Sequence, residues 1–136
     1  MADPRHPRGL IDTSVVIDLE LIEPAHLPEE IAVSAITMAE LAAGPHATTD
    51  PAERARRQDR LQRAEATFEP LPVDTAVARA YGRVYAAVGA EGRKARGRRA
   101  VDLFIAATAV AAGLPLYTRN PDDFVGLSEM LELVVV

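Results

Sequence analysis

Three acidic residues lie inside segments of the sequence that are otherwise apolar. Asp12, Glu40 and Asp102 each interrupt such a segment, and the three segments are far apart along the chain. Asp and Glu are almost never buried in a protein unless they are paired or bind a metal ion. One residue of this kind can be the cap of a helix, but three of them predict a fold that gathers them around a common cation.

The 136 residues are enough for one domain with its own hydrophobic core. The chain has no cysteine, so a metal ion would be held by oxygen atoms or by the three histidines. The sequence shows no pattern of a signal peptide or of a membrane-spanning segment. We expect residues 1–8 to be a flexible leader and residues 9–136 to be a single domain, in a cytoplasmic protein without a membrane partner.

Apolar segments of strand length alternate with longer segments of helical periodicity. Strands are predicted at 9–12, 31–34, 114–118 and 131–136, and helices at 15–22, 51–67, 75–90 and 99–112, with a further helix that contains 37–40 and ends at 44. Asp50 and Asp74 are predicted caps of the helices that follow them. The segment 68–73 holds two prolines and is at best an edge strand. Strands alternating with helices predict an α/β fold whose parallel sheet is covered on both faces.

The acidic residues come shortly after predicted strands. Asp12 ends the first strand, Glu40 follows the second, and Asp122 and Asp123 follow a later one. In parallel α/β sheets, ligands bind beyond the carboxyl ends of the strands. Together with Asp102, near the start of a central apolar helix, these residues can face one edge of the sheet.

Each acidic residue also has a structural explanation. Asp12 can cap the helix that follows it, and Glu40 can be the third residue of a capping box that begins at Thr37. Asp102 is predicted in the first turn of its helix, where the helix dipole favours an acid. The pair at 122–123 is typical of a turn. Each residue could be explained in this way by itself, but their common position after parallel strands favours a shared site.

Ligand sets made only of oxygen atoms select Mg²⁺ or Mn²⁺. Two such ions about 4 Å apart can activate a water and stabilise the leaving oxygen of a phosphodiester. The net charge of −5 does not suggest a nucleic-acid-binding protein, yet a basic run lies just before Asp102. This run, which is either a solvated loop or a contact for phosphates, contains Arg93, Lys94, Arg96, Arg98 and Arg99.

Four motifs together resemble those of the PIN-domain ribonucleases, and in particular the VapC-type toxins of bacterial toxin–antitoxin modules. The motifs are LIDTSV at 10–15, TMAEL at 37–41, VDLFIAATA at 101–109 and YTRNPDDF at 117–124. Each is weak alone, but their order and spacing in a chain of this length are specific. The resemblance extends over residues 9–136.

The resemblance implies a PIN-like three-layer α/β fold with a mostly parallel five-stranded sheet flanked by helices. It also implies a Mg²⁺- or Mn²⁺-dependent endoribonuclease in which Asp12, Glu40 and Asp102 are metal ligands. The protein would act on RNA as the toxin of a toxin–antitoxin pair. Its expected partners are a cognate antitoxin protein and a second copy of the toxin in a homodimer.

The resemblance leaves the fourth acidic ligand open. Asn120, Asp122 and Asp123 all lie in the last of the four motifs. We favour Asp123 as the catalytic ligand, with Asn120 as a helper and Asp122 as an alternative. Thr13 and Thr118 are expected to form hydrogen bonds to the acids and so orient them.

Two other classes of function remain open from the sequence. A phosphoryl-transfer or receiver-like domain would use Asp12 as phosphate acceptor. Phosphatases of that kind have a second aspartate where this chain has Ser14, and receiver domains need a lysine after a late strand, whereas Lys94 lies in a basic loop. A non-catalytic protein-binding module would use the acids only as helix caps.

Overall fold

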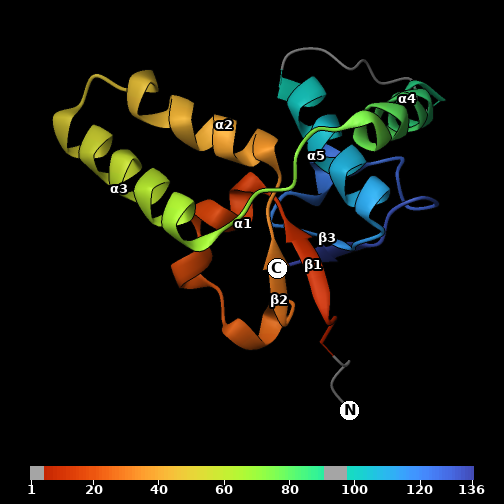
Figure 1. Ribbon diagram of the computed structural model, residues 1–136, viewed down its shortest axis with the longest axis horizontal. Coiled ribbons are helices and arrows are strands. Elements are labelled where there is room, and N and C mark those ends of the chain that lie inside the picture. The colour runs from red at the N-terminus through yellow and green to blue at the C-terminus, as the bar shows by residue number, and fades with distance from the viewer. Residues whose placement is uncertain (1–4, 91–97) are drawn as a thin grey trace.

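The computed structural model describes residues 5–90 and 98–136 of the chain (Figure 1). Within these residues, four parallel strands form one sheet in the order β2-β1-β3-β4. The strands are β1 (Arg8–Ile11), β2 (Glu30–Ala32), β3 (Leu116–Thr118) and β4 (Leu133–Val135). The central strands β1 and β3 are neighbours, so the residues that follow them meet at one edge of the sheet.

Helices cover both faces of this sheet, as the sequence predicts. They are α1 (Thr13–Ile17), α2 (Ala35–Ala43), α3 (Pro51–Thr67), α4 (Thr75–Ala90) and α5 (Arg98–Ala112). Short 3-10 turns connect them at η1 (Leu19–Leu21), η2 (Pro24–His26), η3 (Gly44–Ala47) and η4 (Pro121–Phe124). In Figure 1, α1, α2 and α3 lie to one side of the strands, and α4 and α5 lie to the other.

Alternating residues of the central strands separate the core into two clusters. Leu10 of β1 and Leu116 of β3 are fully buried in the cluster that contains α4 and α5. The next residues, Ile11 and Tyr117, are buried in the cluster that contains α1, α2 and α3. Side chains of successive strand residues point to opposite faces, so these four residues fix both layers of helices against the sheet.

The helix starts that the sequence marks most clearly are found as predicted. Asp50 Oδ2 accepts a hydrogen bond from the Glu53 N–H at 3.2 Å, and α3 runs over Pro51–Thr67. Asp74 Oδ1 accepts one from the Val77 N–H at 3.0 Å, at the start of α4. Each cap satisfies an N–H that has no partner inside its helix, so a local signal is enough to set these boundaries.

Of the two possibilities that the sequence leaves for Thr37 and Glu40, the structure shows the position within a helix and not the capping box. Ser34 caps α2 instead, and its Oγ accepts a hydrogen bond from the Thr37 N–H at 3.0 Å. Thr37 is therefore inside the first turn of α2, and Glu40 lies in the turn after it. Glu40 thus has no capping role at this helix.

The sheet differs from the implied one because the described residues contain four strands rather than five. The extended segment 68–73 contributes one residue, Leu71, which forms an isolated parallel bridge with Ser34. The Leu71 N–H donates to the Val33 carbonyl, and its carbonyl accepts from the Ala35 N–H. Leu71 stands between two prolines, which lack an N–H, so the pairing cannot extend into a strand.

Two other predicted boundaries move. The helix predicted at 15–22 ends at Ile17 and continues as the short turn η1, after the three successive β-branched residues 15–17, which favour helix weakly. The predicted leader joins the fold before residue 9: Arg8 is in β1, and the Arg5 side chain donates to the carbonyls of Leu27 and Pro28. Among the helices of the described residues, none is long and apolar enough to cross a membrane.

A substitution at Gly9 tests how closely the central strands are packed. A Cβ atom at this position would lie 2.5 Å from Cε1 of Tyr117, whose ring is almost fully buried. We expect Gly9→Ala to lower the free energy of unfolding by about 1–3 kcal/mol, as overpacking does in other cores. The matched control is Gly82→Ala in α4, where no atom lies within 4 Å of the new Cβ. It should stabilise the protein by about 0.5–1 kcal/mol. Urea unfolding measures both, and equal stability of the two variants would contradict the packing described.

Candidate functional site

Asp12 lies directly after β1 and is only 4% exposed. Its Oδ1 accepts hydrogen bonds from the Val15 N–H at 3.1 Å and from the Ser14 hydroxyl at 2.6 Å. Asp12 is therefore the cap of α1, which is one of the two roles that the sequence allows.

The second oxygen of Asp12 is left available by this arrangement. No described residue donates a hydrogen bond to Oδ2. In the described part of the chain, no buried side-chain oxygen lacks a hydrogen-bond partner, so Oδ2 is not an orphaned buried atom. The carboxylate is thus anchored through one oxygen and open through the other.

Ser14 connects the end of β1 to the end of β3. Its Oγ donates to Asp12 and accepts a hydrogen bond from the Arg119 N–H at 3.1 Å. The Asp12 N–H also donates to the Tyr117 carbonyl at 3.0 Å. The carboxyl ends of the two central strands are therefore held together at Asp12.

Thr13 connects the same point to α2. Its hydroxyl donates to Oε1 of Glu40 at 2.5 Å. Glu40 is half-buried, and Thr13 is the chain neighbour of Asp12. Asp12 and Glu40, which are 28 positions apart in sequence, are thus joined through a single residue.

Asp102 lies on α5, which packs against both α2 and η4. These are the elements that carry Glu40 and the candidates for the fourth ligand. The helix begins at Arg98 and has no acid in its first turn, so the prediction of Asp102 in that turn is wrong. The stabilisation of a first-turn acid by the helix dipole therefore does not explain this half-buried residue.

The turn after β3 carries Asn120, Asp122 and Asp123. The Asp123 N–H donates to the Asn120 carbonyl, and the Asn120 N–H donates to the Thr118 hydroxyl at 2.9 Å. Asn120 and Asp122 are exposed, and Asp123 is half-buried. Thr118, fully buried, thus fixes the backbone of this turn rather than an acidic side chain. Asp123 as the fourth ligand remains a prediction.

Of the basic run, Arg93, Lys94 and Arg96 lie outside the described residues. Arg98 is the first residue of α5. The Arg99 side chain donates to the backbone carbonyl of Asp123 at 3.3 Å, so it lies beside the turn that follows β3. Contact of this run with phosphates remains a prediction.

The acids meet the needs of a divalent cation in part. Within residues 5–90 and 98–136, no group of three or more His, Asp or Glu side chains is close enough to hold a metal ion. Mg²⁺, however, is usually held by one or two carboxylates, several waters and a substrate phosphate. The open oxygen of Asp12, with Glu40 joined to it through Thr13, fits that smaller requirement.

The sequence predicts the hydrogen bond from Thr13 to an acid, but not the roles of Ser14, Ser34 and Thr37. From sequence, Ser14 is only a departure from the phosphatase pattern, Ser34 is the end of a predicted strand, and Thr37 is the start of a possible capping box. The signal that was available is the Ser34-x-x-Thr37 spacing, which is typical of an N-cap and the third residue of a helix. The contact of Thr37 with Thr13, at 3.0 Å between the two Oγ1 atoms, depends on the packing of α1 against α2.

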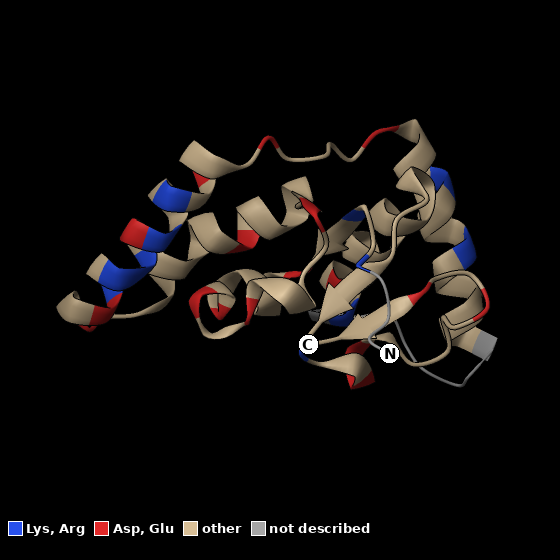
Figure 2. Cartoon of the chain, turned by 90° about the horizontal axis from the view of Figure 1, so that it is seen from below, with Lys and Arg blue, Asp and Glu red and all other residues tan. Residues whose placement is uncertain are grey.

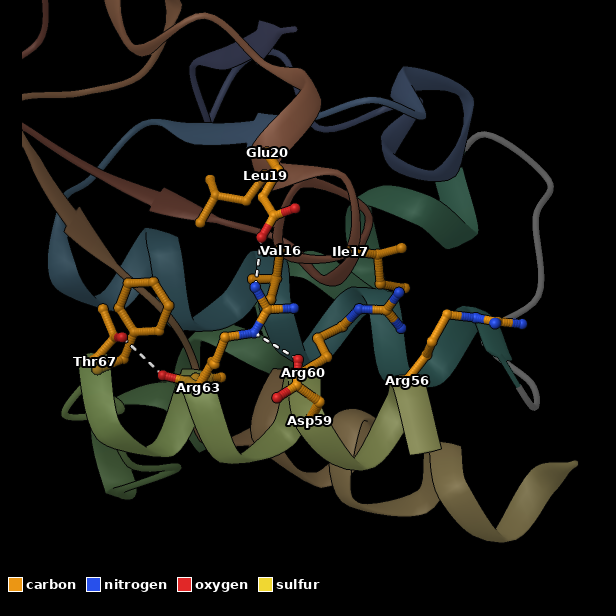
Figure 3. A pocket seen from close by; sticks show the side chains of 11 residues that line it. Val16, Ile17, Leu19, Glu20, Arg56, Asp59, Arg60, Arg63 and Thr67 are labelled. Carbon is orange, nitrogen blue, oxygen red and sulfur yellow. Dashed lines mark hydrogen bonds and ion pairs between the residues drawn. The ribbon is translucent and has the colours of Figure 1, made fainter. Parts of the chain in front are cut away.

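A groove whose lining does not include Asp12, Glu40 or Asp102 lies between α1, η1 and α3, with a volume of about 410 Å³ (Figure 3). Val16, Ile17 and Leu19 are among its apolar lining residues. Arg63 on its rim pairs with Glu20 and Asp59. Arg60 points from α3 toward α1 in Figure 3, and no described carboxylate pairs with it.

Comparison with known proteins gives a consistent result. The model of the PIN domain family matches residues 9–128. The chain is similar to ribonuclease VapC5 of Mycobacterium tuberculosis, at 34% identity over 131 residues that cover 94% of this chain and 93% of the relative. It is also similar to ribonuclease VapC4 of that organism, at 37% identity over 119 residues that cover 85% and 88%.

A solved structure agrees with these relatives. It is a crystal structure of VapBC-5, a member of the VapBC family of toxin–antitoxin systems from Mycobacterium tuberculosis. One of its chains superposes on this fold with a TM-score of 0.80 at 34% identity, covering 96% of this chain and 99% of that one.

The capping bond of Asp12 can be separated from its charge. We expect Asp12→Ala to lower the free energy of unfolding by about 1 kcal/mol, because the Val15 N–H loses its acceptor. Asp12→Asn keeps an oxygen at that position and should stay within about 0.5 kcal/mol of the parent, since Asn and Asp are similar N-caps. Urea unfolding in EDTA measures both. An Asp12→Ala variant as stable as the parent would show that the cap contributes nothing.

Proposed function

Because the chain belongs to the PIN-domain family and, within it, to the VapC proteins, we propose that it is a metal-dependent endoribonuclease. It would act as the toxin of a toxin–antitoxin pair and hydrolyse RNA phosphodiesters. The observation that carries the proposal is the Asp12 carboxylate, which is 4% exposed, fixed through Oδ1 and open through Oδ2 at the carboxyl edge of the sheet.

In this proposal, Asp12, Glu40, Asp102 and Asp123 hold Mg²⁺ or Mn²⁺. When bound, the cation supplies an activated water and positive charge for the phosphate oxygens. Ser14 and the Val15 N–H fix Asp12, and Thr13 fixes Glu40, so both carboxylates are oriented before a ligand arrives. Such outer contacts set the direction of metal ligands in other proteins.

The substrate part of the proposal rests on the position of α5. Arg99 lies beside the turn after β3, and it belongs to the basic run that contains Arg93, Lys94, Arg96 and Arg98. Arginine and lysine contacts with phosphates supply most of the sequence-independent affinity for nucleic acids. A cytoplasmic location and a toxin homodimer complete the proposal.

The two other classes of function are less well supported. A module whose acids are only caps would explain Asp12, but Glu40 is inside α2 and Asp102 lies beyond the first turn of α5. A receiver-like domain would need a lysine after a late strand, whereas the lone lysine, Lys94, precedes α5 and β3 in the sequence. The family to which the chain belongs favours the nuclease.

We further propose that a cognate antitoxin occupies the groove between α1, η1 and α3. Ile17, on its wall, is 46% exposed, and Leu21 of the adjoining η1 is 78% exposed. Apolar side chains grouped in this way mark surfaces that partners cover. The structure of VapBC-5 is that of a toxin–antitoxin system, which supports a protein partner.

The charges around the groove specify the chemistry of this partner. The chain has a net charge of −5, yet arginines recur along α3, with a few acidic residues between them (Figure 2). Arg56 and Arg60 line the groove, and Arg56 pairs with Glu53 of its own helix. Arg60 has no described carboxylate partner, so we expect the antitoxin segment to place a carboxylate opposite Arg60 and apolar side chains against Val16 and Ile17.

The nuclease proposal predicts loss of cleavage without loss of the fold. Asp12→Asn and Asp102→Asn should each reduce cleavage of total RNA by more than about 100-fold, beyond the effect of residues that only orient a ligand. EDTA should abolish parental cleavage, and added Mg²⁺ or Mn²⁺ should restore it. Asp74→Asn is the matched control, because this aspartate also caps a helix but lies at α4. Parental rates in both site variants would refute the assignment.

The partner proposal predicts one dominant side chain in the groove. Arg60→Ala should weaken the complex with the protein encoded by the adjacent reading frame by about 30-fold, as truncation of a central interface arginine does. Arg79→Ala, an exposed arginine of α4, is the control and should bind as the parent does. Isothermal titration calorimetry measures both affinities. Equal losses in the two variants would place the antitoxin elsewhere.

A further inference from the structure

Four side-chain oxygens form a continuous line from the start of α2 to Glu40. The Ser34 and Thr37 hydroxyls are 3.4 Å apart, and those of Thr37 and Thr13 are 3.0 Å apart. The line ends at Oε1 of Glu40, 2.5 Å from the Thr13 hydroxyl. At its other end, Ser34 Oγ accepts the Thr37 N–H and so belongs to the N-terminal turn of α2.

Counting protons gives this line one direction. A carboxylate only accepts hydrogen bonds, and each hydroxyl has one proton to donate. The Thr13 proton goes to Glu40, so the proton between Thr13 and Thr37 comes from Thr37. The Thr37 oxygen in turn can only accept from Ser34. Every hydroxyl therefore points toward Glu40.

Burial fixes the middle of the line. Ser34 and Thr37 are fully buried, so water does not compete for their protons. Thr37 and Glu40 are three residues apart on α2 and share one helical face, which is turned toward Thr13 of α1. A chain of hydrogen bonds that ends on a charge is polarised along its length, and its bonds strengthen one another.

We propose that Thr37 is a positioning residue that, through Thr13, holds the Glu40 carboxylate by Oε1 and leaves Oε2 for a divalent cation. This inference rests on the proposed metal-dependent nuclease. Without a proton from Thr37, the Thr13 oxygen loses the bond that orients it, its hydroxyl can turn to solvent, and Glu40 loses its fixed direction. Thr37 acts only through Thr13 and does not touch the reacting atoms.

The variant Thr37→Val tests this role with little change in shape. Valine has the size of threonine but no hydroxyl, and the backbone N–H that Ser34 caps remains. Thr37→Ser keeps the hydroxyl and should restore the parental behaviour. Thr108→Val is the matched control: Thr108 is also buried in a helix, but its hydroxyl donates to the Phe104 carbonyl of α5.

The measurement is the dissociation constant for Mn²⁺, obtained from the free-ion signal in electron paramagnetic resonance with the purified full chain and no RNA. We expect Thr37→Val to raise this constant on the order of 10-fold, as loss of an outer contact does at other metal sites. Thr37→Ser and Thr108→Val should bind as the parent does. Thr37→Ala gives the same comparison if Thr37→Val does not fold.

A Glu40→Gln variant separates the two ways in which this could fail. If Glu40→Gln weakens Mn²⁺ binding but Thr37→Val does not, the positioning role of Thr37 is wrong and the metal site stands. The positioning role is also wrong if Thr108→Val weakens binding as much as Thr37→Val. If the parent binds no Mn²⁺, or Glu40→Gln binds it as the parent does, the proposed metal site itself is wrong.

Discussion

The burial of Asp12 at the end of β1 is the constraint on which the rest of the site depends. A carboxylate of a residue that is only 4% exposed needs hydrogen-bond donors, and Ser14 and Val15 supply them. The Val15 N–H begins α1, and Ser14 also receives the Arg119 N–H beyond β3. Satisfying one charge therefore fixes the start of a helix and the pairing of two strand ends.

Helix capping and metal binding are often treated as competing explanations of an acidic residue. In Asp12 the two roles use different atoms, since capping occupies Oδ1 and no described residue donates to Oδ2. Glu40 of α2 is not a cap, but one of its oxygens is held in the same way, because Thr13 donates to Oε1. A carboxylate that caps a helix can thus also belong to a metal site. The geometry of both its oxygens decides whether it does.

The parts of the fold that could be predicted from sequence are those set by local signals. Asp50 and Asp74 cap the helices that they were expected to cap, because a cap bonds to an N–H three residues away. Other features depend on segments that are distant in sequence, so no local pattern predicts them. They include the single β-bridge of Leu71 and the hydroxyl contact between Thr13 and Thr37. The fourth ligand stayed open because its candidates share one short turn.

The shortness of α1 brings the proposed nuclease site and the proposed partner groove onto one element. Asp12 caps its first turn, and Ile17, its last residue, lines the groove. A helix of five residues is about 7.5 Å long. A partner seated on Ile17 is therefore within one helix length of the acidic edge, and any shift of α1 would also move the residues that hold Asp12 and Glu40. A partner that shifts α1 from the groove would therefore inhibit the proposed nuclease through this helix alone.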